Sequence, residues 1–237
     1  RRLDMKVLHF LRHGQALHNI NAEPMKAAGC TFEAFLAQMK VDDFFDAPLT
    51  VSGVSQATTA GSLARSKAIA TSLDLIVTSP LSRAIDTANL VFPPSPTPSP
   101  TPSPTPTSST RMVLEDLREI NGWLLNGKRR TRAELNNRYP TFDTSMVLTD
   151  EDVLWQAEIL EEDESVRARV NRALSFLWER EEENIAVVAH GGLFKKMIDG
   201  NFLVSSDLDG KFENCELKSC SFEMVDGKFE LQELPVC

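Results

Sequence analysis

The sequence predicts an α/β protein in which helices cover both faces of an open, mostly parallel sheet. Three short apolar runs, at residues 5–11, 73–79 and 185–189, are typical of strands covered on both faces. Each run ends in a polar signature, and a helical pattern follows it. Strands that alternate with helices pair in parallel, because each crossover returns the chain to the same edge of the sheet. We therefore expect a three-layer α/β/α fold.

The composition is ordinary for a folded globular protein. The chain has 237 residues, of which 42% are hydrophobic and 25% charged, and can form a sizeable core. Its net charge of −9 argues against a nucleic-acid or membrane-surface partner, since such binding needs basic surface. No apolar run approaches the roughly 20 residues of a membrane helix. We expect a cytoplasmic protein, with room for a targeting segment upstream of residue 1 because the sequence does not begin with Met.

Local patterns predict the remaining elements. Asp226-Gly227 separates two alternating runs, 220–225 and 229–234, and is typical of a hairpin turn between edge strands. Thr131 and Glu134 have the spacing of a helix capping box, and Thr50 or Ser52 caps the helix that follows Pro48. We expect helices at 14–22, 32–39, 52–68, 82–88, 131–139, 164–183 and 193–201, and a short strand at 111–114.

Residues 93–110 differ in kind from the rest of the chain. Pro93-Pro94 is followed by alternating Ser-Pro and Thr-Pro pairs up to Pro106. This stretch has no core-forming side chains, which predicts an extended or disordered insertion within a single domain spanning 1–237. A solvated spacer is the favoured interpretation. The alternative is a docking segment for a proline-directed kinase or a proline-binding module.

Two arginines and two histidines follow the ends of the predicted strands. They are Arg12 and His13 before Gly14, Arg83 after Ser79-Pro80, and His190 before Gly191-Gly192. Ligands bind beyond the carboxyl ends of parallel strands, so we expect these side chains to converge. Arginines bind phosphate oxygens bidentately, and a neutral imidazole can attack phosphorus. The set predicts a site for a small phosphorylated substrate that needs no metal and no cofactor. The absence of a P-loop argues against a nucleotide-driven kinase.

Four separated stretches carry a family resemblance. Residues 11–19, 48–57, 79–88 and 187–192 together resemble the motifs of the histidine phosphatase superfamily, in the branch that contains the cofactor-dependent phosphoglycerate mutases. The resemblance implies that His13 is the phosphorylated nucleophile. It implies that Arg12, Arg83 and His190 form the phosphate pocket, with Asn19 and Gly191 lining it. Glu119 matches the family's proton donor.

The same comparison shows departures from the mutases. Residues 122–127 lack both the Trp-Glu-Gly of small bacterial members and the Asn-Glu-Arg-His-Tyr-Gly of the glycolytic mutases. We therefore predict a phosphomonoesterase that acts through a phosphohistidine at His13. A mutase is the alternative, and a non-catalytic phosphate-binding or scaffold protein is less favoured.

Several other polar residues have competing interpretations. Glu115 and Asp116 compete with Glu119 for the acid role. The basic run at Lys128, Arg129, Arg130 and Arg132 is either a solvated loop or a reader of extra phosphates or carboxylates on the substrate. His9 and His18 are expected to be structural or peripheral. The four cysteines, Cys30, Cys215, Cys220 and Cys237, are expected to be reduced thiols, because none forms a CxxC pair or lies near a histidine at zinc-ligand spacing. A Cys215–Cys220 disulfide is the less favoured alternative.

Overall fold

The structure is a computed structural model that describes residues 5–41, 43–94, 109–201, 203–204 and 208–234. Most of the proline-rich segment predicted at 93–110 lies outside these residues, as does Cys237. None of the helices in the described ranges is long and apolar enough to cross a membrane.

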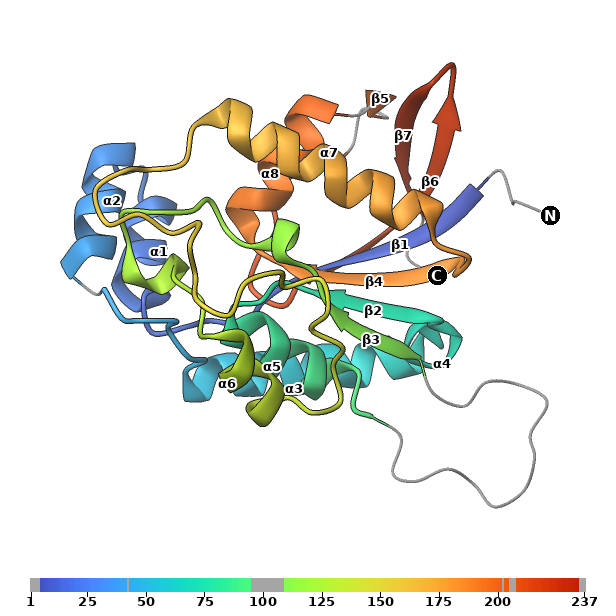
Figure 1. The fold of residues 1–237 in the computed structure, drawn as a ribbon, viewed down its shortest axis with the longest axis horizontal. Coiled ribbons are helices and arrows are strands. Elements are labelled where there is room, and N and C mark those ends of the chain that lie inside the picture. Colours follow the sequence, from blue (N-terminus) through green and yellow to red (C-terminus); the bar gives the residue numbers. More distant parts are fainter. Residues whose placement is uncertain (1–4, 42, 95–108, 202, 205–207, 235–237) are drawn as a thin grey trace.

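A seven-stranded sheet in the order β3-β2-β4-β1-β6-β7-β5 forms the middle of the molecule (Figure 1). Neighbouring strands from β3 to β1 are parallel, and β5 is parallel to β7, whereas β6 is antiparallel to both β1 and β7. This is the open, mostly parallel sheet that the sequence predicts. The strands are β1 (Met5–Arg12), β2 (Leu75–Thr78), β3 (Thr110–Val113), β4 (Asn184–Ala189), β5 (Leu203–Val204), β6 (Leu217–Val225) and β7 (Lys228–Glu233).

Helices cover both faces of the sheet, which confirms the three-layer architecture (Figure 1). Successive side chains of β4 point to opposite faces: Val187 packs with the helices α7 and α8, and Val188 packs with α3 and α5. Each face therefore has its own apolar core. The helices are α1 (Asn19–Ala27), α2 (Phe32–Val41), α3 (Val51–Ser66), α4 (Ile69–Ser72), α5 (Ser82–Val91), α6 (Arg132–Arg138), α7 (Asp163–Glu179) and α8 (Gly191–Asn201), with 3-10 turns η1 (Glu115–Leu117) and η2 (Leu125–Gly127).

The local capping predictions are confirmed. Thr50 Oγ1 accepts a hydrogen bond from Gly53 N at 2.9 Å and so caps α3. Thr131 and Glu134 form the reciprocal capping box of α6. The hairpin turn also holds, because both Asp226 and Gly227 have the positive φ angles that a two-residue turn requires.

Two expectations about position were wrong. Neither strand of the hairpin is an edge strand: β6 pairs with β1 from Met5↔Glu223 to Leu11↔Leu217, and β7 pairs with β5 on its other side. The first helix does not begin at residue 14. Residues 14–18 instead form a loop beside the start of α3, where Thr50 N donates to the carbonyl of Gln15 at 2.9 Å. The first helix, α1, begins at Asn19.

Candidate active site

The carboxyl ends of β1, β2 and β4 lie side by side, at the end of the sheet where these parallel strands stop (Figure 1). Arg12 is in register with Ala189, and Thr78 is in register with Val188. The residues that follow these strands, His13, Ser79 and His190, are therefore neighbours although they lie far apart in the sequence. Arg83 joins them from the first turn of α5. We call Arg12, His13, His18, Arg83 and His190 the strand-end cluster.

His13 is held in a single tautomer. Its Nδ1 lies 2.7 Å from the carbonyl oxygen of Gly14, so Nδ1 must carry the proton and Nε2 keeps its lone pair. Arg83 Nε donates to that Nε2 at 3.3 Å. Burial, reinforced by the charges of Arg83 and Arg12, lowers the pKa of His13 well below its usual value. The imidazole is thus neutral at neutral pH, which is the state that can act as a nucleophile.

In each arginine of the cluster, some guanidinium nitrogens donate hydrogen bonds within the protein and one buried nitrogen has no partner among the described residues. Arg12 Nη1 donates to the carbonyl of Phe212 at 2.7 Å, and Nη2 pairs with the carboxylate of Glu23. Arg83 Nη1 donates to the carbonyl of Asn126 at 2.7 Å. Within the described part of the chain, Arg12 Nε and Arg83 Nη2 are buried without a hydrogen-bond partner. Burial lowers the pKa of Arg83 to about 10, so it stays charged at neutral pH.

The two other histidines of the cluster are also buried. His190 Nε2 lies 2.8 Å from Ser79 Oγ, and its ring centroid is 5.0 Å from that of His13. The His18 ring centroid is 6.1 Å from that of His13. Among the residues described, Nδ1 of His18 and Nδ1 of His190 have no hydrogen-bond partner. Burial, followed by the charge of Arg83, lowers the pKa of both well below the usual value.

Glu119 lies beside the cluster and faces the first turn of α8. Its Oε2 accepts from Gly192 N at 3.1 Å, and its Oε1 accepts from Ile120 N at 2.9 Å. A Cβ atom at Gly192 would stand 2.6 Å from Glu119 Oε1, so only glycine permits this approach. Arg169 of α7 fixes the Glu119 backbone, because its Nη2 donates to the Glu119 carbonyl at 3.1 Å.

The two competing carboxylates are committed elsewhere. Glu115 accepts from Arg118 and Arg129, and Asp116 pairs with Arg172 on the outer side of α7. Burial raises the pKa of Glu115. Glu119 is therefore the acidic residue of residues 115–119 that the structure brings to the cluster.

Close backbone packing positions the loop that carries His13. A Cβ atom at Gly14 would stand 2.6 Å from the carbonyl oxygen of Gly53, so the loop rests directly on the start of α3. Gly14 N donates to Thr87 Oγ1 at 3.0 Å. Asn19 Oδ1 accepts from Ala16 N at 3.0 Å and holds the turn that leads to α1. Asn19 thus stabilises the turn after His13, and its role in phosphate binding stays a prediction.

The basic run is neither a solvated loop nor a set of free cations. Arg129 is 2% exposed, and its guanidinium donates to Glu115 and to the carbonyls of Thr149, Asp150 and Glu151. Arg130 Nε pairs with the buried Asp46 at 3.0 Å. Asp46 in turn accepts from the backbone and hydroxyl of Ser82, at the start of the helix that carries Arg83. The run therefore stabilises the wall of the site.

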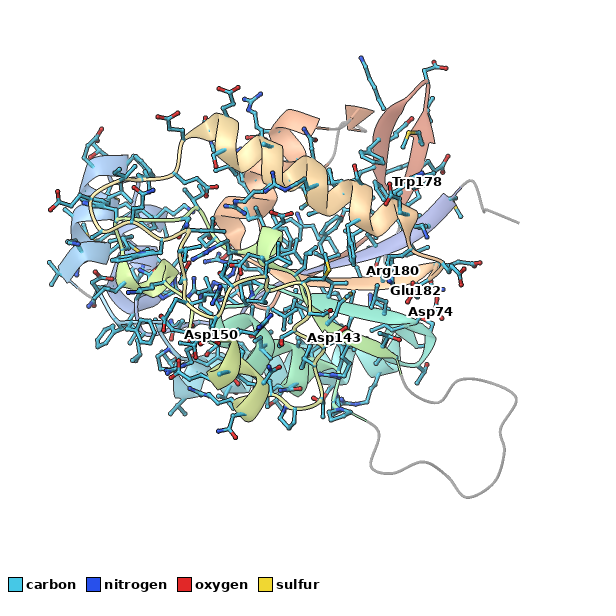
Figure 2. The ribbon with its side chains drawn as sticks, in the orientation of Figure 1. Asp74, Asp143, Asp150, Trp178, Arg180 and Glu182 are labelled. Carbon is cyan, nitrogen blue, oxygen red and sulfur yellow. The ribbon has the colours of Figure 1, made fainter. Side chains whose placement is uncertain are left out.

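A separate hollow of about 870 Å³ opens at the opposite edge of the sheet, where β2, β3 and β4 begin. Figure 2 shows Asp74, Arg180 and Glu182 beside it, at the far end of the molecule from α1 and α2. Its acidic lining would repel a phosphate. Across the ranges described, no group of three or more His, Cys, Asp or Glu side chains is arranged to hold a metal ion.

Sequence reasoning missed two residues at the cluster, His18 and Glu23. Both lie in a stretch without clear periodicity, and His18 was expected to be structural or peripheral. The signal that could have placed His18 at the cluster was its short distance along the chain from His13, because a tight turn keeps residues 14–18 near the end of β1. His9 matches its expectation better: it lies within β1 and its Nδ1 is 2.8 Å from Ser219 Oγ.

Two proteins of known sequence are similar to this chain over most of its length. The chain is 28% identical over 235 residues to phosphoglycerate mutase-like protein 1 of Arabidopsis thaliana, covering 90% of this chain and 80% of that protein. Phosphoglycerate mutase-like protein 2 of the same plant is 29% identical over 267 residues, covering 93% of this chain and 74% of its own length.

Solved structures share the fold at lower identity. The alpha-ribazole phosphatase of Shigella flexneri superposes with a TM-score of 0.53 at 19% identity, over 97% of this chain and 96% of that one. A mycobacterial glucosyl-3-phosphoglycerate phosphatase gives 0.52 at 19% identity, over 97% of each chain. The sequence model of one family, described as the histidine phosphatase superfamily (branch 1), matches residues 8–235. A match over nearly the whole chain, on a fold of the same kind, makes this protein a member of that superfamily.

Proposed function

We propose that the chain is a phosphomonoesterase that transfers the phosphoryl group of a small substrate to His13 and then to water. The observation that carries this proposal is a set of buried nitrogens near His13 that have no hydrogen-bond partner among the described residues. Arg12 Nε, His18 Nδ1, Arg83 Nη2 and His190 Nδ1 all belong to the strand-end cluster. A buried polar group without a partner costs about 1–3 kcal/mol, and phosphoryl oxygens are the acceptors that would satisfy these nitrogens.

In the first step His13 Nε2 attacks phosphorus and the bond from phosphorus to the ester oxygen breaks. As Nε2 approaches phosphorus, Arg83 turns its hydrogen bond from Nε2 to a phosphoryl oxygen and so frees the lone pair that forms the P–N bond, while Arg12 and His190 stabilise the charge that builds on the other oxygens. The leaving oxygen takes a proton from the Glu119 carboxyl group. Without that proton an alkoxide leaves poorly.

In the second step a water molecule attacks the phosphohistidine. Glu119, now a carboxylate, accepts the proton of the water, and the P–N bond breaks with its electron pair returning to Nε2. Inorganic phosphate leaves and the starting state is restored. The tautomer of His13 supports this cycle, because the bond from Nδ1 to Gly14 keeps Nε2 free of a proton.

Replacing His13 by Ala tests the nucleophile. We expect turnover of phosphomonoesters to fall at least about a thousandfold, because no other group can form the covalent intermediate. Rapid quenching of the unchanged protein with labelled substrate should trap a phosphoprotein that survives alkali and is lost in acid, and the variant should form none.

The matched control is His9→Gln, since His9 is a buried histidine of β1, the strand that His13 follows, and its Nδ1 contacts Ser219 Oγ rather than a residue of the cluster. It should retain both turnover and the phosphoprotein. A folded His13→Ala variant that still turned over substrate would refute the role of His13.

A mutase is the second candidate, and the names of the plant relatives favour it. In a mutase the phosphoprotein outlasts the release of the dephosphorylated intermediate, and the phosphoryl group returns to a second hydroxyl. Incubation with a phosphorylated sugar acid distinguishes the two. Isomerisation stimulated by a bisphosphate would indicate a mutase, whereas release of inorganic phosphate alone would indicate a phosphatase.

A further inference from the structure

A carboxylate lies among the cations of the strand-end cluster. Glu23, on the second turn of α1, forms an ion pair with Arg12, and the two side chains are 24% and 8% exposed. Both side chains are therefore mostly buried. One of the two arginines of the cluster thus has an acidic partner, and in the part of the chain described its buried Nε is the nitrogen without any hydrogen-bond partner.

The other cations near the cluster also have acidic or aromatic partners. Arg118 is bound by Asp152 through two hydrogen bonds of 2.8 and 2.5 Å, and Arg129 and Arg130 are bound by Glu115 and Asp46. Lys128 lies over the ring of Trp155, with its Nζ 4.8 Å from the ring centroid. Among the described residues, Arg118, Arg129 and Arg130 are thus each paired with a carboxylate, which weakens their attraction for a second anionic group of a substrate.

From this charge arrangement we propose that Glu23 determines specificity: the enzyme selects phosphomonoesters whose alcohol carries no second anionic group. The proposal rests on the phosphatase function above. The phosphoryl dianion is bound by Arg83 Nη2 and Arg12 Nε, while Glu23 repels a carboxylate or second phosphate attached to the same small molecule. Like charges that share a site of effective dielectric constant about 20 oppose each other's binding on the order of tenfold to hundredfold.

Two three-carbon substrates isolate this effect. Glycerol 3-phosphate and 3-phosphoglycerate differ mainly in a hydroxymethyl group that is replaced by a carboxylate. We expect kcat/KM for glycerol 3-phosphate to exceed that for 3-phosphoglycerate by about tenfold to hundredfold in the unchanged protein. Glu23→Gln removes the negative charge at nearly constant shape and should reduce this ratio by at least about fivefold, even if both substrates bind more tightly once Arg12 is released.

The matched control is Glu33→Gln, which removes the same charge from an exposed position on the neighbouring helix α2. It should leave the ratio unchanged, because the charge of an exposed side chain is screened. A merely structural role for Glu23 would lower both kcat/KM values together and leave the ratio intact, which would overturn the proposal. So would an equal preference for the two substrates in the unchanged protein.

Calorimetric binding separates this proposal from the phosphatase function. If neither compound is hydrolysed, the proposed function fails, and the dissociation constants of the two compounds still measure the selectivity. A preference for glycerol 3-phosphate that Glu23→Gln reduces and Glu33→Gln does not would support the role of Glu23 on its own. Equal binding, or no binding of either compound, would refute it.

Discussion

Glu119 is the residue on which the leaving group depends in the proposed mechanism. Both of its carboxylate oxygens accept backbone hydrogen bonds, from Ile120 and Gly192, so the side chain is already oriented. We expect Glu119→Gln to slow the hydrolysis of an alkyl phosphate by about 10²–10⁴-fold, because the amide cannot donate the proton. Hydrolysis of p-nitrophenyl phosphate should fall much less, since nitrophenolate leaves without protonation.

Asp116→Asn serves as the control for this comparison, because Asp116 pairs with Arg172 rather than facing the cluster. It should leave the ratio of alkyl to nitrophenyl turnover unchanged. Parallel losses on the two substrates in the Glu119 variant would remove Glu119 from the acid role.

The sequence is sufficient to predict the residues that follow buried strands. His13, Arg83 and His190 could be placed together because parallel strands end at one edge, and this rule needs no knowledge of loops. His18, Glu23 and Asp46 could not, since each depends on how an aperiodic segment folds across the strand ends. Arg129 illustrates the same limit. Its charge predicted either a solvated side chain or a contact with substrate, whereas in the structure it is buried and donates to several backbone carbonyls.

At the scale of elements, helix α7 fixes the position of Glu119, the proposed acid, through the side chain of Arg169. Arg169 is 4% exposed and donates to the carbonyls of Asp116, Arg118 and Glu119, and it also binds the carboxylate of Glu161. We expect Arg169→Met to lower the free energy of unfolding by about 3–5 kcal/mol, because it leaves the half-buried carboxylate of Glu161 and three backbone carbonyls without their partner. Urea unfolding monitored by circular dichroism measures this loss.

In the proposed mechanism Arg169 also acts on the reaction, because it holds the backbone of Glu119. The milder variant Arg169→Lys keeps the charge but cannot reach every carbonyl, so it should fold and should lower alkyl phosphate turnover more than nitrophenyl phosphate turnover. Arg172→Met, on the exposed side of the same helix, should cost less than about 1 kcal/mol and leave the ratio unchanged. Equal effects of the two arginines would contradict a positioning role.

The hairpin of β6 and β7 shows what local sequence signals omit at this scale. Its turn could be predicted because Asp226 and Gly227 favour positive φ angles. Its position beside β1 could not, because pairing between strands some 210 residues apart leaves no mark in the turn. That pairing matters for the site, since the residues that lead into β6 include Phe212, whose carbonyl anchors Arg12.

At the scale of the whole molecule, all four histidines of the chain are buried and have lowered pKa values. Burial lowers the pKa of His9 to about 4, and the pKa values of the other three fall well below 6.5. Below pH 6.5 the unfolded chain therefore binds protons that the folded chain does not. Stability that is fully present above about pH 7 should fall as the pH decreases, by about 1 kcal/mol per histidine for each pH unit below 6.5.

Urea unfolding at pH 7.5, 6.5 and 5.5 tests this expectation. His9→Gln should make the decline between pH 6.5 and 5.5 shallower, because one of the four titrating groups is removed. A free energy of unfolding that stays constant from pH 7.5 to 5.5 would show that the histidines are not held neutral in the folded protein.

The place of β1 in the sheet has a consequence for the making of the protein on the ribosome. β1 spans Met5–Arg12, but its two neighbours begin only at Asn184 and Leu217. At a synthesis rate of about 5–20 residues per second, this apolar strand waits roughly 10–35 seconds before its first partner emerges. β2 and β3 emerge earlier but cannot shelter it, because β4 separates them from β1. We therefore expect the proposed hydrolytic activity to appear only when the hairpin strand β6 has been translated.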